Sequence, residues 1–188
     1  LGATITAQLH RYGENSSIPV VQHFNHKPED PMALTNPLPV IAIVEPETPF
    51  ADVVSQRCRD VVLVSQWEDV PLSLLDLPAR VSVDDGLDPA FQVGLRFTEA
   101  PFDISLFDGG YPQSARRFRP HTDIDYSFRV FNGELDGVLH YCGDLFDPRV
   151  VDDMCSHFVR LLDAFLDDPS LPISEPSMLA PHERERLL

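Results

Sequence analysis

Apolar and polar residues alternate most clearly between residues 124 and 141, which predicts two β-strands joined by a short turn. The apolar positions of this region are Ile124, Tyr126, Phe128, Val130, Leu135, Leu139 and Tyr141. Between the strands, Asn132 and Gly133 tolerate the positive φ angles of a two-residue type I′ turn. Such a turn pairs Arg129 with Asp136, Asp125 with His140, and Val130 with Leu135. The pattern therefore predicts a half-buried hairpin of defined register, with its polar pairs on the surface.

A helical pattern follows the hairpin. Asp147 is placed to cap the helix, and Pro148 suits its first turn. The apolar stripe consists of Val150, Val151, Met154, Phe158, Leu161, Leu162 and Phe165. At about 1.5–3 kcal/mol for each large side chain buried, this stripe would contribute about 10–20 kcal/mol against chain entropy. We therefore expect the helix to pack on the hairpin.

The remaining elements are predicted by similar patterns. Helices are expected over 1–12, with Gly13 as C-cap, and from Thr48 and Pro49 to about Trp67. The predicted inner face of the second helix is Phe50, Val53, Val54, Cys58, Val61 and Val62. Strands are expected over 18–24, 38–44 and 90–98, with a further candidate strand at 102–107, a helical turn at 71–77 and a loop at 109–120.

These elements predict an α/β fold, a mixed β-sheet flanked by helices on one or both faces. Residues 1–169 are expected to form one folded lobe. Residues 170–188 contain three prolines, which argues against a packed element and favours a linker.

Composition excludes several classes of partner. Thirty acidic against fourteen basic residues give a formal charge of −16, which would repel nucleic acids and anionic membranes. No apolar run approaches the roughly 20 residues of a membrane span, and no signal segment opens the chain, so we expect a cytoplasmic protein. The three cysteines show no paired spacing, and no disulfide is expected. A basic cluster at 116–119 reads either as a solvated patch or as a contact for an acidic protein.

The spacing of histidine, cysteine and acidic residues gives little indication of a catalytic or metal-binding site. His23, His26 and Asp30 are too poor a set for a metal site, because no cysteine or third histidine is close. His121 near Asp123 suggests a general base, but a lone histidine beside acids is more often structural. Neither a phosphate-binding glycine loop nor a nucleophile elbow is present in the sequence.

Several short motifs occur in an order typical of a known family. They lie at residues 9–12, 34–40, 68–72, 88–93, 141–147, 172–174 and 183–188. Together they resemble the C-terminal half of a condensation domain from a nonribosomal peptide synthetase. The Asp-Leu-Phe-Asp run at 144–147 is the most specific. The positions that match the family's motifs, expected to serve structure or a substrate channel, are Asn36, Asp69, Pro71, Pro89, Gln92 and Asp147.

The resemblance implies one lobe of a chloramphenicol acetyltransferase-like fold. Such domains join two carrier-bound acyl groups through an amide bond, using a His-His-x-x-x-Asp-Gly motif that this sequence lacks. The resemblance also implies that no cofactor is bound directly and that phosphopantetheine is carried by a partner carrier domain. Leu87 stands where the family commonly has an arginine that pairs with the motif's Asp, and Trp67 replaces a frequent histidine.

Two functions follow from these observations. The first is a partial, non-catalytic condensation-like domain that acts as a structural platform for a downstream adenylation domain. The second is half of an active condensation domain whose catalytic histidine lies on another lobe. In either case the apolar face normally covered by the other lobe needs a cover, supplied by the adenylation domain, a carrier protein or a second copy.

Overall fold

The computed structural model describes residues 1–25, 35–70, 92–98, 122–131, 133–180 and 183–185. The predicted turn at 71–77, candidate strand at 102–107 and loop at 109–120 lie outside these ranges. In chain order the elements are α1 Gly2–Gly13, β1 Ser17–Asn25, β2 Thr35–Ile43, α2 Phe50–Ser65, β3 Val93–Thr98, β4 Ile124–Phe131, β5 Glu134–Tyr141 and α3 Pro148–Asp167.

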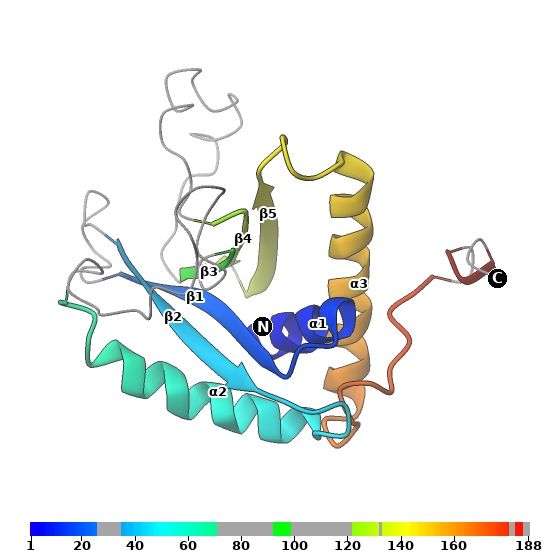
Figure 1. Ribbon diagram of the computed structural model, residues 1–188, viewed down its shortest axis with the longest axis horizontal. Helices are drawn as coiled ribbons and strands as arrows, with labels where there is room; N and C mark the ends of the chain where they lie inside the picture. Colours follow the sequence, from blue (N-terminus) through cyan, green and yellow to red (C-terminus); the bar gives the residue numbers. More distant parts are fainter. Residues whose placement is uncertain (26–34, 71–91, 99–121, 132, 181–182, 186–188) are drawn as a thin grey trace.

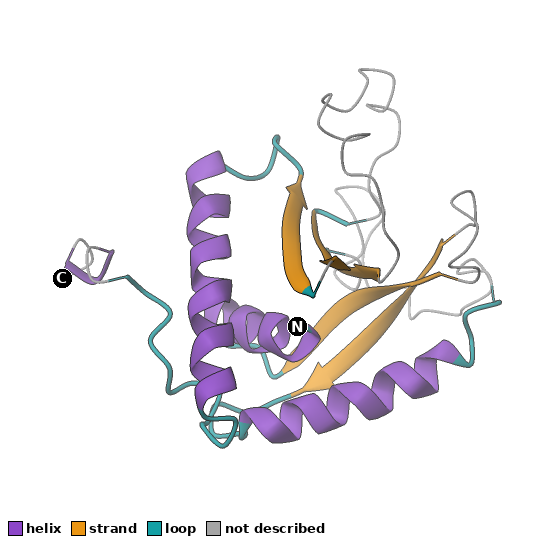
Figure 2. Cartoon of the chain, turned by 180° about the vertical axis from the view of Figure 1, so that it is seen from behind, coloured by secondary structure: helices purple, strands orange, loops and turns teal. Residues whose placement is uncertain are grey.

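The five strands form one mixed sheet in the order β2-β1-β3-β4-β5. The central contacts β1–β3 and β3–β4 are parallel, and the outer contacts β1–β2 and β4–β5 are antiparallel. One face of the sheet shares a hydrophobic core with α1, α2 and α3 (Figures 1 and 2). We call this the core face and the opposite side the second face. The predicted mixed α/β fold is confirmed.

The hairpin β4–β5 has the predicted register. Its pairs include Arg129 with Asp136, Asp125 with His140, and Val130 with Leu135. Gly133 has a φ of 81°, as the predicted turn requires, and Nη2 of Arg129 donates to Oδ2 of Asp136 at 2.8 Å. The apolar end of the hairpin is less buried than predicted, because Val130 and Leu135 remain 38% and 46% exposed.

Helix α3 begins as predicted and packs on the hairpin. Oδ1 of Asp147 accepts a hydrogen bond from the backbone N–H of Arg149, and Pro148 occupies the first turn. The ring of Phe158 lies 5.3 Å from that of Phe128, centroid to centroid. The predicted stripe needs one correction: Val150 is half exposed, and the buried residues are Val151, Met154, His157, Phe158, Leu161 and Phe165.

Helix α1 lies at the centre of the molecule and is buried on nearly all sides. It contacts β1, α2 and α3. Small residues allow this close packing; the buried residues are Ala3, Thr4, Ile5, Thr6, Ala7, Gln8 and His10. The prediction that Gly13 caps this helix is wrong, because Glu14 is the left-handed residue, with a φ of 51°.

Helix α2 also differs from its prediction. Thr48 does not open the helix; its hydroxyl accepts a hydrogen bond from the N–H of Glu45. The buried positions of the helix are Phe50, Val53 and Arg57, whereas Val54, Cys58 and Val62 are exposed. A hydrophobicity pattern misses Arg57, whose Nη1 donates to the carbonyl of Val40 at 3.2 Å. Burial lowers the pKa of this guanidinium to about 10, although the charge of Asp60 opposes the change.

Residues 170–180 pack against the lobe, so the expectation that prolines would prevent a packed element is wrong here. Ile173 is fully buried and its N–H donates to the carbonyl of Thr48. The carbonyls of Pro169 and Leu171 accept hydrogen bonds from the first N–H groups of α2, which an isolated helix leaves unsatisfied. Proline removes only its own N–H donor and keeps its carbonyl acceptor. That residues 170–188 lead to another domain remains a prediction.

The stacked pair Phe50–Phe165, with ring centroids 4.1 Å apart, should hold the start of α2 to the end of α3. We expect Phe165→Ala to lower the free energy of unfolding by about 3–5 kcal/mol, because it removes a fully buried ring. The matched control, Leu166→Ala, truncates an exposed neighbour and should change it by less than about 0.5 kcal/mol. Urea unfolding followed by circular dichroism measures both, and equal effects would contradict this packing.

Candidate functional site

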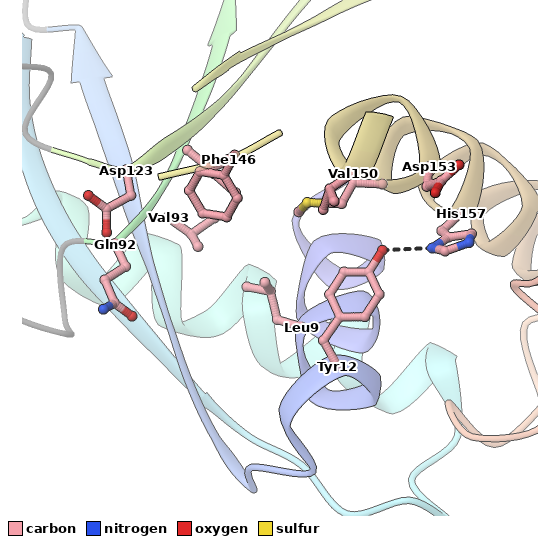
Figure 3. A pocket seen from close by; sticks show the side chains of 11 residues that line it. Leu9, Tyr12, Gln92, Val93, Asp123, Phe146, Val150, Asp153 and His157 are labelled. Atoms are coloured by element: carbon pink, nitrogen blue, oxygen red, sulfur yellow. Dashed lines mark hydrogen bonds between the residues drawn. The ribbon is translucent and has the colours of Figure 1, made fainter. Parts of the chain in front are cut away.

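A cavity of about 490 Å³ lies between α1, α3 and the starts of β3 and β4 (Figure 3). Its lining residues are Leu9, Tyr12, Gln92, Val93, Asp123, Ile124, Phe146, Val150, Asp153, Met154 and His157. This volume is in the range of small-molecule sites. Most of these side chains are apolar, and polar groups stand at the two ends: Tyr12, Asp153 and His157 at one, Gln92 and Asp123 at the other.

The hydroxyl of Tyr12 lies 2.8 Å from Nδ1 of His157, so this part of the cavity wall is a connected pair of side chains. Burial raises the pKa of Tyr12 to about 12, which keeps the hydroxyl protonated at neutral pH. Burial also raises the pKa of Asp123 at the other end. The cavity can therefore accept an apolar group and offers hydrogen-bonding contacts at its ends.

A second polar cluster lies on the second face of the sheet. Nε2 of His23 on β1 is 3.0 Å from Oδ2 of Asp125 on β4, and both side chains are about nine-tenths buried. The intervening strand β3 has Gly94 at this position, where a Cβ would lie 2.7 Å from Oδ2 of Asp125. A glycine is therefore required for the two side chains to meet across β3. Ser127 donates to Oδ1 of the same carboxylate at 3.1 Å.

Charged neighbours decide the ionisation of Asp125. Burial alone would raise its pKa, but the hydrogen bond and charge of His23, the charge of Arg96 and the hydrogen bond from Ser127 lower it overall. Burial lowers the pKa of His140, which pairs with Asp125 across the hairpin. The prediction of a surface pair at Asp125 and His140 is correct in register but wrong in exposure, because Asp125 is buried.

The structure places four of the six motif positions. Nδ2 of Asn36 donates to the carbonyls of Glu68 and Val70, at 2.8 and 2.7 Å, and so holds the turn after α2 against β2. Asp69, within that turn, is exposed. Two motif segments far apart in sequence are thus joined by one side chain.

The other two described motif residues also serve structure. The carbonyl of Gln92 accepts hydrogen bonds from the N–H groups of Asp123 and Ile124, and Gln92 lines the cavity. Asp147 caps α3. Pro71 and Pro89 lie outside the described residues, as do the histidines and aspartate named above as candidates, His26, His121 and Asp30.

Sequence reasoning missed His157 as a site residue. A histidine within the apolar stripe of a helix, one turn after Met154, was the signal that could have found it, because a buried imidazole needs a partner. The described residues contain no group of three or more histidine, cysteine, aspartate or glutamate side chains arranged to hold a metal ion. All three thiols, Cys58, Cys142 and Cys155, are free.

A match to the condensation-domain family covers residues 32–188. The chain belongs to the condensation-domain family. Tyrocidine synthase 3 of Brevibacillus parabrevis is 31% identical over 143 residues, a match that covers 74% of this chain and 2% of the synthase. Surfactin synthase subunit 2 of Bacillus subtilis is 23% identical over 160 residues, covering 81% of this chain and 4% of the subunit. The chain thus spans a small part of the curated relatives it matches.

Solved structures show the same condensation-domain fold. A four-domain nonribosomal peptide synthetase bound to AMP and glycine matches with a TM-score of 0.76 at 15% identity, over 97% of this chain and 16% of that one. The X-domain from teicoplanin biosynthesis matches with a TM-score of 0.71 at 24% identity, over 95% of this chain and 43% of that one. The expected family and fold are confirmed. No helix within the described ranges is long and apolar enough to cross a membrane.

Removing the side chain of Asn36 tests its role in joining the two motif segments. We expect Asn36→Ala to lower the free energy of unfolding by about 1–2 kcal/mol, because two carbonyls lose a donor. Gln66→Ala, which truncates an exposed amide close to the same turn, should change it by less than about 0.5 kcal/mol. Urea unfolding separates the two, and an Asn36→Ala chain as stable as the control would show that the side chain does not hold this turn.

The lowered pKa of Asp125 predicts a pH dependence. A carboxylate whose pKa is lower in the folded state than its unfolded value of about 3.9 stabilises the fold above that value, and this contribution disappears as pH falls through the folded pKa. Asp125→Asn lacks the contribution. The difference in unfolding free energy between wild type and variant should therefore shrink below about pH 4.

Denaturant unfolding from about pH 6 to about pH 3 measures this difference. Asp163→Asn, which removes an exposed carboxylate on α3, controls for the loss of one negative charge. A wild-type advantage over Asp125→Asn that stays constant through this range would contradict the prediction.

Proposed function

We propose that the chain is a partial, non-catalytic condensation lobe of a nonribosomal peptide synthetase, and that it serves as a structural platform for an adjoining adenylation domain. The observation that carries the proposal is a second apolar stripe on α3. It consists of Cys155, Val159 and Leu166, and we call it the outer stripe. Val159 and Leu166 are 53% and 68% exposed, although the core stripe of the same helix is buried.

Such a stripe favours a protein partner. Two apolar stripes on one helix indicate that the helix packs on two sides, and the described part of this chain covers only one of them. The relatives are peptide synthetases, and a solved structure of this fold belongs to a four-domain synthetase. An X-domain that shares the fold, at 22% identity and a TM-score of 0.71, is known in complex with OxyB. The adenylation domain is the partner to which we assign the outer stripe, in a cytoplasmic enzyme.

The absence of the arginine that pairs with the family's catalytic motif supports the non-catalytic role. Leu87 cannot form the salt bridge that an arginine forms with the family's catalytic motif, since it carries no charge. The described motif residues Asn36, Gln92 and Asp147 hold turns, strand starts and a helix end. These structural roles support the proposed platform.

The second candidate is the C-terminal half of an active condensation domain, with the catalytic histidine on a missing N-terminal lobe. It is favoured by the fold of the chain, which matches that of a synthetase with a TM-score of 0.76. In this case the chain would help to form an amide bond between acyl groups carried on the phosphopantetheine arms of carrier domains.

One assay on the full parent synthetase separates the two candidates. Donor and acceptor substrates are loaded on the carrier domains and the amide product is followed by mass spectrometry. For a platform, we expect no amide from this module, while deletion of residues 1–180 impairs adenylation or solubility. Amide formation that disappears on deletion would establish the second candidate.

The outer stripe is tested within the same parent protein. We expect Val159→Glu to lower the rate of amino-acid-dependent ATP–pyrophosphate exchange several-fold, because a carboxylate in an apolar interface is costly to desolvate. Arg149→Glu is the control: it changes an exposed residue by two charge units at the start of α3, outside the outer stripe. Equal rates for both variants would overturn the assignment. So would a dimer of this chain that Val159→Glu dissociates, since a second copy would then be the partner.

A further inference from the structure

A chain of hydrogen bonds, buried at its two ends and part-buried around Tyr12, crosses the molecule from the sheet to the C-terminal segment, which comprises residues 170–180 and 183–185. The hydroxyl of Tyr126 on β4 donates to Oε1 of Gln8 at 3.0 Å, and Nε2 of Gln8 donates to the hydroxyl oxygen of Tyr12 at 3.0 Å. From there the hydroxyl of Tyr12 lies 2.8 Å from Nδ1 of His157, and Nε2 of His157 lies 3.2 Å from Oε1 of Glu183. The chain thus links β4, α1, α3 and the C-terminal segment.

The hydrogen bonds of this network all donate in the same direction, from Tyr126 towards Glu183. Burial raises the pKa of both tyrosines, so each hydroxyl carries a proton that it must donate. The oxygen of Tyr12 already accepts from Gln8, and its own proton therefore goes to Nδ1 of His157. The proton of a neutral His157 then resides on Nε2 and is donated to Glu183. Every donor in the chain has an acceptor in this arrangement.

Glu183 is the last residue of this chain of hydrogen bonds and lies in the C-terminal segment. Its side chain is 7% exposed, and its second oxygen, Oε2, accepts a hydrogen bond from the N–H of Ala180 at 2.5 Å. A buried carboxylate is tolerated only where such partners replace water. The same segment is held from α1, because the guanidinium of Arg11 donates to the carbonyl of Pro176.

We propose that Tyr12, His157 and Glu183 form a lock that fastens the C-terminal segment to the lobe, with Glu183 as its positioning residue. The significance of this lock rests on the proposed platform function, because the lock would fix the position at which the following domain is joined to the lobe. A broken link leaves buried donors and acceptors unpaired along the chain, so the lock acts as a unit. Tyr12 and His157 also line the cavity, which places the middle of the lock at the cavity wall.

Exchange of the backbone amide hydrogens of this protein with solvent tests the lock directly. Reporter amides in the segment are those of Ile173, Ser174 and Arg184, which donate to backbone carbonyls. We expect Glu183→Gln to speed their exchange at least tenfold, while amides of the β4–β5 hairpin keep their rates. Glu175→Gln is the matched control, an exposed glutamate of the same segment, and should leave all rates unchanged.

A second variant tests the lock from its far end. Tyr12→Phe removes one hydroxyl on α1, and we expect the reporter amides to exchange several-fold faster. Adding Tyr12→Phe to Glu183→Gln should accelerate them less than the product of the two single effects, because the groups act as a unit. The lock is overturned if Glu183→Gln matches Glu175→Gln, if Tyr12→Phe leaves the segment unchanged, or if the hairpin amides accelerate as much as the reporters.

The outcome is independent of the platform test. Exchange in this chain requires no adenylation domain, so a loosened segment in Glu183→Gln, combined with normal adenylation after deletion of the lobe from the parent protein, would support the lock and count against the platform. Unchanged exchange in Glu183→Gln, combined with loss of adenylation on deletion of the lobe, would support the platform and overturn the lock.

Discussion

Burial of α1 is the constraint on which the rest of the structure depends. This short helix has the sheet on one side and the two longer helices on others, and Ile5 at its centre has no exposed surface. Close packing on several sides requires small side chains, which explains the run of alanine and threonine in its sequence. The buried hydroxyl of Thr4 has no hydrogen-bond partner among the described residues, but a longer polar side chain on this helix can find one inside the protein. Gln8 does so by joining β4, Tyr12 and the carbonyl of Met154.

Helix α3 connects this core to the functional proposals. Its core stripe packs on the hairpin, His157 leads the polar chain towards the C-terminal segment, and the outer stripe remains available to a partner. Three sides of one helix therefore serve three separate contacts. The C-terminal segment in turn supplies the carbonyl of Leu171 to the first turn of α2, so the start of this helix depends on residues that the sequence suggests are a linker.

Several polar groups of the described lobe serve its architecture. Asn36 joins β2 to the turn after α2, Asp147 caps α3, and Asp125 lies beside His23 and accepts a hydrogen bond from Ser127 on the second face. A platform needs such internally satisfied polar groups, because they define one arrangement of the chain without requiring a substrate. The same groups provide a stable half for a larger catalyst, which is why the assay in the parent protein is decisive.

Local sequence patterns were sufficient for the hairpin register, the start of α3, the mixed sheet and the family, because each depends on residues close in sequence or on short motifs. Tertiary structure alone decided the other features. Arg57 lies in the core although the predicted inner face of α2 did not include it, and His23 reaches Asp125 because Gly94 on the strand between them has no side chain. His157 meets Glu183 only because the C-terminal segment folds back. A sequence pattern records the spacing of residues along one element, whereas these contacts join elements whose relative positions are set by packing.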